Sequence, residues 1–166
     1  GFSRAGYTFL GWNTTSNATT ALSSFNIPSG GAELFAVWQA NTNTAYSTQH
    51  YWQDVGLSTY TLHQTTSHTG TTGATANAAP LTYTDYSYYS GAPGSVLSGV
   101  IAGDGSLVLK VYYTRKLYNV TFNINGGTGT APGTVNQAYG TAVTLPGTSG
   151  FSRAGYTFLG WNTTSN

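Results

Sequence analysis

The sequence predicts a mainly β protein in which small repeat domains follow one another in tandem. Its polarity comes from Thr, Ser, Asn and Gln rather than from charged residues, which make up only 5% of the chain, and 22 Gly and 13 Tyr accompany them. Thr and Tyr favour pleated, half-buried surfaces, while Gly and Asn supply turns. Several segments alternate apolar and polar residues, as strands do. The segment Gly1–Asn17 also recurs letter for letter as Gly150–Asn166.

This repeated segment indicates that the chain is slightly more than one period of a longer array. Self-similarity at a fixed period, here 149 residues, is typical of repeat proteins. We therefore expect each end of the chain to carry part of one domain type, at 1–39 and 118–166. A second domain type should lie between them, at 46–115. The two copies of the segment should share one local conformation.

The domain at 46–115 should be built from strands. We expect a first strand over YSTQHYWQ, a second over 58–67, and a loop over 70–80, which is small, polar and rich in turn residues. Gly103-Asp104-Gly105 lies between two alternating apolar runs, which is the signature of a tight hairpin. In the first strand, alternation places one set of side chains on a single face: Tyr46, Thr48, His50 and Trp52. In the strand after Gly105, it places another set on a single face: Leu107, Leu109, Val111 and Tyr113.

The other domain type should begin with a strand near Tyr118. Asn125-Gly126-Gly127 would then turn the chain, and 134–145 has the pattern of a returning strand. After the first copy of the repeated segment the chain continues into a closing strand, in which alternate residues face opposite ways. The residues expected to face the core of the opening strand are Tyr118, Val120, Phe122 and Ile124, and those sharing one face of the closing strand are Leu34, Ala36 and Trp38.

Three motifs, VTFNINGG, GYTFLGWNTTSN and LFAVW, resemble the Listeria–Bacteroides repeat, also called the internalin-type B-repeat. The resemblance covers 1–39 and 118–166, and Phe35 replaces a commoner Tyr. It implies a β-grasp-like fold, a curved sheet crossed by a short helix, in bacterial surface proteins, and the helix would fall at 19–25. The matching positions are Val120–Phe122, Asn125–Gly127, Gly155–Phe158, Gly160, Trp161, Gly6–Phe9, Gly11, Trp12, Leu34, Ala36 and Trp38.

The domain at 46–115 is similar to another group, the mucin-binding-protein (MucBP-like) repeats, which often alternate with the former family. YSTQHYWQ, YTLHQTTSHTGTTG and DGSLVLKVYYTR carry this resemblance. The matching residues are mostly strand and turn positions. The resemblance therefore implies a β domain, while the mucin binding in the family's name comes without an assigned residue.

The residues do not predict an enzyme, a cofactor or a metal site. The four carboxylates are scattered, so no pair converges on one bond as a glycosidase requires. His50, His63 and His68 lie in one domain, but neither Cys nor clustered acids accompany them. The formal charge of +1 provides no basic stripe for nucleic acid, and no apolar run approaches the roughly 20 residues of a membrane span.

One aromatic cluster is a candidate ligand site. The segment LTYTDYSYYSG contributes Tyr83, Tyr86, Tyr88 and Tyr89. Aromatic faces stack on the apolar faces of sugar rings, and the hydroxyl can form a hydrogen bond. These four residues are therefore a possible glycan platform, although Tyr is also an ordinary sheet residue.

The function expected from these features is that of a structural stalk repeat in an extracellular, secreted adhesin or fibre of a bacterial cell surface. Its partners would be the neighbouring repeats, and short linkers at 40–45 and 115–117 would join rigid domains into a rod. One alternative is a glycan- or mucin-binding module. A second alternative is a self-assembling extracellular filament subunit, in which the domain divided between the two ends is completed between chains.

Overall fold

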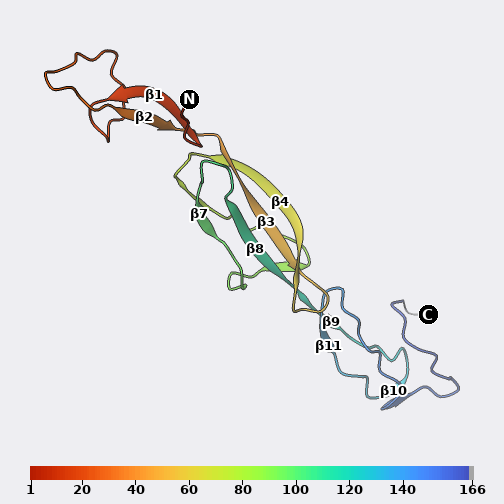
Figure 1. Cartoon of the computed structure of the whole chain (residues 1–166). Helices are drawn as coiled ribbons and strands as arrows, with labels where there is room; N and C mark the ends of the chain where they lie inside the picture. Colours follow the sequence, from red (N-terminus) through yellow and green to blue (C-terminus); the bar gives the residue numbers. More distant parts are fainter. Residues whose placement is uncertain (165–166) are drawn as a thin grey trace.

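The computed structural model describes residues 1–164, and these residues form twelve strands and no helix (Figure 1). They form three groups along an elongated molecule, called here the head unit (1–40), the middle unit (44–115) and the tail unit (117–164). The prediction of a mainly β fold is confirmed. The strands are β1 (Tyr7–Asn13), β2 (Phe35–Ala40), β3 (Thr44–Gln53), β4 (Tyr60–Gly70), β5 (Thr75–Asn77), β6 (Tyr86–Tyr88), β7 (Ser98–Val100), β8 (Val108–Arg115), β9 (Leu117–Val120), β10 (Thr128–Gly129), β11 (Val135–Ala138) and β12 (Phe151–Ser152).

The head unit is an antiparallel pair of β1 and β2, with one register shift between Phe9 and Gly11. Gly11 has a φ of 137°, a conformation open to glycine, and this allows the bulge. The helix expected at 19–25 is wrong, because this segment is irregular. Its Thr and Ser residues favour local bonds over a helix. Two bonds tie the segment to β1 instead, from Leu22 N–H to the Trp12 carbonyl and from the Asn13 amide to the Thr20 carbonyl.

The middle unit holds a four-stranded sheet in the order β4-β3-β8-β6, with β3 and β8 parallel and the other pairs antiparallel. A small sheet of β5 and β7 covers part of it. The predicted alternation is confirmed at the centre, because Leu109, Val111 and Tyr113 are fully buried on one face of β8. The core forms two clusters, Ala76, Ile101 and Leu109, then Tyr86, Val111 and Tyr113.

Two details of the middle unit differ from expectation. The turn at Gly103-Asp104-Gly105 is present, with a bond from Gly105 N–H to the Ala102 carbonyl and a φ of 77° at Gly105. The flanking strands do not form a hairpin, however, because β7 pairs with β5 and β8 pairs with β3. The segment 70–80, predicted as a loop, contains the strand β5, which pairs with β7. Its small residues, including buried Ala76, allow it to lie close against β7 and the sheet.

The tail unit has two short antiparallel pairs, β9 with β11 and β10 with β12. The predicted turn is confirmed, since Asn125 and Gly126 have φ of 46° and 76° and Gly127 N–H bonds the Ile124 carbonyl. The returning strand expected at 134–145 is shorter, at Val135–Ala138. The exposed residues after it, such as Leu145, have no strand beside them in the described chain.

The two copies of the repeated segment have the same local conformation, as predicted, within the described residues. Tyr7 N–H donates to the Arg4 carbonyl over 3.0 Å, and Tyr156 N–H donates to the Arg153 carbonyl over 3.1 Å. The glycines within these turns have φ of 75° and 79°. The rings of the two copies meet at matching centroid distances: Phe2–Phe9 5.1, Phe2–Trp12 5.5 and Phe9–Trp12 5.5 Å, against Phe151–Phe158 5.4, Phe151–Trp161 5.5 and Phe158–Trp161 5.3 Å.

Candidate functional site: the junctions between units

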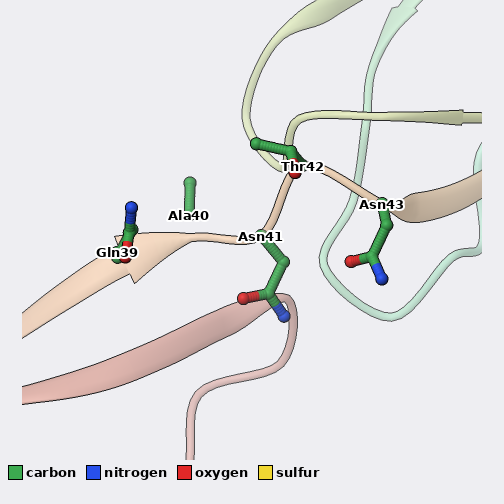
Figure 2. A pocket seen from close by; sticks show the side chains of 5 residues that line it. All are labelled: Gln39, Ala40, Asn41, Thr42 and Asn43. Atoms are coloured by element: carbon green, nitrogen blue, oxygen red, sulfur yellow. The ribbon is translucent and has the colours of Figure 1, made fainter.

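The connection between the head and middle units is held by Asn41, which bonds to both. Its N–H donates to the Gly6 carbonyl over 2.8 Å, and its carbonyl accepts from Thr72 N–H over 2.9 Å. Its side-chain oxygen accepts a bond of 2.7 Å from the Thr8 hydroxyl. Figure 2 shows this side chain directed toward the ribbon of the head unit, away from that of Thr42. The surface here is a shallow polar depression of about 320 Å³, lined by Gln39, Ala40, Asn41, Thr42 and Asn43.

Two glycines let the head and middle units meet through their backbones. A β-carbon on Gly6 would overlap the Cα of Gly103 and the side chain of Thr72, and one on Gly103 would overlap the Ala5 carbonyl. The turn that carries Gly103 is therefore an interface element. Sequence reasoning assigned it only a turn, because nothing in one chain shows that two distant glycines face each other.

Arg115 closes the junction between the middle and tail units. Its Nε donates to the Gln53 carbonyl over 2.9 Å, within the middle unit, and its Nη1 donates to the Tyr139 carbonyl over 2.7 Å, within the tail unit. Lys116 alone separates β8 from β9. Its N–H donates to the Asp85 carbonyl and its carbonyl accepts from Tyr139 N–H, at 2.9 and 2.8 Å. These two bonds hold the backbone of Lys116 to the unit on either side, and a swing about Lys116 must break the Arg115–Tyr139 bond that spans it.

Aromatic side chains add to the same junction. The Tyr118 hydroxyl of the tail unit donates to the Asp85 carboxylate of the middle unit over 3.0 Å, and this bond raises the pKa of Tyr118. The rings of Tyr86 and Tyr139 meet across the junction with centroids 6.1 Å apart. The Arg115 guanidinium lies over the Tyr86 ring at 5.4 Å, within the range of a cation–π contact.

The four tyrosines predicted as a glycan platform do not share one exposed face. Tyr86 is buried in the core, and Tyr83 packs edge-on against Tyr113 at 4.9 Å. Tyr88 and Tyr89 are exposed, at 40% and 39%. The ring of Tyr88 lies on the same side of the chain as Tyr113. Successive residues of an extended chain point to opposite sides, so Tyr89 does not share a face with Tyr88.

A second set of tyrosines, which the sequence reasoning missed, lies on the outer face of the sheet. Tyr51 stacks on Tyr112 with centroids 4.9 Å apart, and Tyr60 meets Tyr112 edge-on at 5.1 Å. Burial raises the pKa of Tyr60, as do the neighbouring Tyr89 and Tyr112. The alternation in the sequence already places Tyr51 and Tyr112 on the face opposite the core-facing residues. The sequence does not show that β3 and β8 are neighbours, and only the structure brings the two tyrosines together.

The three histidines are each engaged with an aromatic ring rather than with one another. His50 is buried and its Nδ1 lies 2.9 Å from the Tyr113 hydroxyl. His63 stacks on Trp52, and His68 stacks on Tyr46. Among residues 1–164 the structure groups no three side chains that could hold a metal ion. It also contains no helix long and apolar enough to cross a membrane within that range.

Small β units that meet through short, bonded junctions and share a perfectly repeated segment define a tandem structural-repeat protein. The sequence model of the Listeria-Bacteroides repeat domain matches residues 1–37 and 118–166, more than half of the chain, and the chain belongs to this family. Such repeats are structural domains of bacterial surface proteins. Neither the curated proteins nor the solved structures include a match to this chain.

Proposed function

We propose that this chain is a stalk segment of a secreted bacterial adhesin or fibre, in which Listeria-Bacteroides repeats alternate with a MucBP-like unit to form a stiff rod. The observation that carries this proposal is the pair of junctions. At each, one linking residue, Asn41 or Lys116, bonds through its backbone to the units on both sides, within a connection of one to three residues. Connections this short hold no slack, so the units cannot swing as beads on a flexible linker do.

The junction bonds have the right size to stiffen a rod. One hydrogen bond contributes about 0.5–1.5 kcal/mol net, and bonds to a charged group such as the Arg115 guanidinium contribute more. Two bonds span the junction of the middle and tail units, from Arg115 to the Tyr139 carbonyl and from Tyr118 to Asp85, and breaking both costs several times the thermal energy. The close contact of Gly6 with Gly103 adds direct packing at the other junction. In a longer array these repeated contacts would set the reach of a domain at its tip.

A pair of insertion variants tests the stalk role. Small-angle X-ray scattering of the dilute chain should give one narrow, elongated pair-distance distribution. A flexible Gly-Ser insert after Asn41 should broaden that distribution and shift it to shorter distances, since the junction bonds are lost. The same insert in the exposed irregular segment after Ser24 is the matched control and should leave the shape unchanged. A native chain that already scatters like the Asn41 insertion variant would contradict the proposal.

A second candidate function is glycan binding by the middle unit. The observation that favours it is the outer face of the sheet, where Tyr51, Tyr60 and Tyr112 are half-buried and the edge residue Tyr89 is exposed. Stacked rings beside hydroxyl groups suit sugars. NMR titration with mucin-type oligosaccharides should move the signals of this face, and Tyr112→Ala should remove the response. Shifts confined to Tyr83 and Tyr88 would instead favour the segment predicted from the sequence, and no shift would exclude both.

A further inference from the structure

One edge of the main sheet in the middle unit is long and lacks most of the features that usually protect sheet edges. β4 is the outer strand of the order β4-β3-β8-β6, and Figure 1 shows it running lengthwise along one flank of the middle unit. Edge strands are usually short, or carry charged residues, Pro or a bulge. β4 has 11 residues, YTLHQTTSHTG, with no Pro, Asp, Glu, Lys or Arg among them. A register shift at His63 protects its first part only, and Gln64–Gly70 is regular.

The backbone of this regular segment presents donors and acceptors away from the sheet. Ser47 N–H donates over 3.1 Å to the carbonyl of Leu107, just before β8, so the backbone of Ser47 faces β8. Ser67 lies directly opposite Ser47 in the antiparallel pair of β3 and β4. Bonded and unbonded pairs alternate in such a ladder, so the N–H and C=O groups of Ser67, Thr65 and Thr69 point outward. Within residues 1–164 no strand pairs with this edge.

We propose that Gln64–Gly70 pairs with the same segment of a second copy of this chain, antiparallel about a two-fold axis through Ser67. The axis sets Ser67 against Ser67 and Thr65 against Thr69. The residues with outward backbone groups then face one another, as the bonded pairs of an antiparallel ladder require. This register uses every residue of the regular segment, because its two ends meet each other. Each molecule contributes its own β4, so the pair is closed as a dimer.

The chemistry of the edge suits a copy of itself. Thr65, Ser67 and Thr69 are exposed, and their side chains are short hydroxyls. Thr and Ser side chains stabilise one another when they lie opposite across two strands. The segment Gln64–Gly70 carries no Asp, Glu, Lys or Arg, so two copies approach without like-charge repulsion at neutral pH. A strongly charged partner would find no counter-charge on this edge.

Antiparallel edges set the two molecules in opposite directions. β4 runs along the long axis of the molecule, so the head unit of one copy points the same way as the tail unit of the other (Figure 1). Stalks that project from two facing surfaces meet in this orientation, whereas neighbours on one surface run parallel. The edge would therefore join stalks from facing surfaces. This role rests on the proposed stalk function, while the pairing itself rests on β4 alone.

Charge variants at the two-fold axis test the pairing by analytical ultracentrifugation over a range of concentrations. The native chain should pass from a monomer of 17.4 kDa to a dimer as its concentration rises. Ser67→Lys and Ser67→Glu should each weaken the dimer at least ~3-fold, because like charges then face each other across the axis. An equal mixture of the two variants should dimerise at least as well as the native chain. Ser87→Lys, at an exposed position of the opposite edge strand β6, is the matched control and should dimerise like the native chain.

Three results would overturn the pairing. One is a native chain that stays monomeric at every concentration. Another is a mixture of Ser67→Lys and Ser67→Glu that dimerises as weakly as either variant alone. The third is an equal weakening by Ser87→Lys, which would show that added charge acts wherever it is placed.

Energy transfer between dyes tests the antiparallel orientation. The chain has no Cys, so Ser24→Cys in the head unit and Ser149→Cys in the tail unit each accept one dye at an exposed position. Transfer should be stronger between head-labelled and tail-labelled molecules than between two sets of head-labelled molecules. The reverse order would show parallel pairing, and the proposal would be wrong.

Coated beads test whether the edge joins facing surfaces. Beads that carry the native chain should clump. Beads that carry Ser67→Lys and beads that carry Ser67→Glu should clump only when the two kinds are mixed. Dimers in solution without clumping of the beads would overturn the joining of surfaces. Failure of the stalk function itself would appear separately, in the scattering of the insertion variants described above.

Discussion

Replacing Gly6 by Ala should loosen the junction between the head and middle units, and the repeat itself provides the control. Gly6 and Gly155 occupy the same place in the two copies, with φ of 75° and 79°. Alanine in this left-handed region costs about 1–2 kcal/mol at either site. Only at Gly6 would the new methyl group overlap another unit, at Gly103 and Thr72, while the Gly155 position has open space.

The extra cost at Gly6 can be estimated from overpacking. Inserting a methyl group against backbone that cannot rotate away costs typically about 1–3 kcal/mol. We therefore expect Gly6→Ala to destabilise the head unit by about 2–5 kcal/mol, against about 1–2 kcal/mol in the tail unit for Gly155→Ala. Gly103→Ala should cause the same overpacking cost from the middle unit, because its methyl group would overlap the Ala5 carbonyl of the head unit.

Amide hydrogen exchange measures this effect at the junction itself. The N–H groups of Asn41 and Thr72 bond to Gly6 and Asn41 across the connection, so they should exchange faster in Gly6→Ala and Gly103→Ala. In Gly155→Ala they should keep their native protection. Native protection of these two amides in Gly103→Ala would refute the reasoning, because the close contact would then be unnecessary and Gly6 would be needed only for its φ.

Three further predictions concern the middle unit and its second junction. Replacing Gly105, whose φ is 77°, by Val should lower the free energy of unfolding by at least about 1 kcal/mol, and an unchanged denaturant midpoint would show that the turn tolerates a side chain. Arg115→Lys should keep the charge but lose the fork that reaches Gln53 and Tyr139, so dye pairs on the middle and tail units should report a wider distance distribution; an unchanged distribution would count against the clamp. Burial, with the nearby His68 and His63, lowers the pKa of His50 below its usual 6.5. The unfolded chain therefore takes up a proton first, and the free energy of unfolding should stay level above pH 6.5 and fall below it, by at most about 1.4 kcal/mol per pH unit. His50→Gln should flatten that slope, and a slope equal to the native one would assign the effect to other groups.

Local patterns in the sequence predicted local features well. Alternation identified the buried face of β8, and the Asn125-Gly126-Gly127 motif gave the turn with two left-handed residues. These features depend on neighbours along the chain, which one sequence contains. The identity of the two copies likewise predicted their common conformation, because the same side chains form the same turn and ring contacts.

Strand pairing and junction contacts could not be predicted in the same way. The Gly103 turn suggested a hairpin, but β8 pairs in parallel with β3, which lies far away along the chain. The contact of Gly6 with Gly103 has no pattern in the sequence, since each glycine also fits an ordinary turn. Tyr86 and Tyr88 look alike in the sequence, yet one is buried and the other exposed because β6 lies at the sheet edge beside β8.

The most direct test of the rod is ¹⁵N relaxation of the backbone amides, recorded on the native chain at high dilution. If the junctions hold, the head, middle and tail units will fit a single, strongly anisotropic rotational diffusion tensor. If each unit instead fits its own faster and nearly isotropic tumbling, the units are joined by flexible links, and the account of the junctions is wrong.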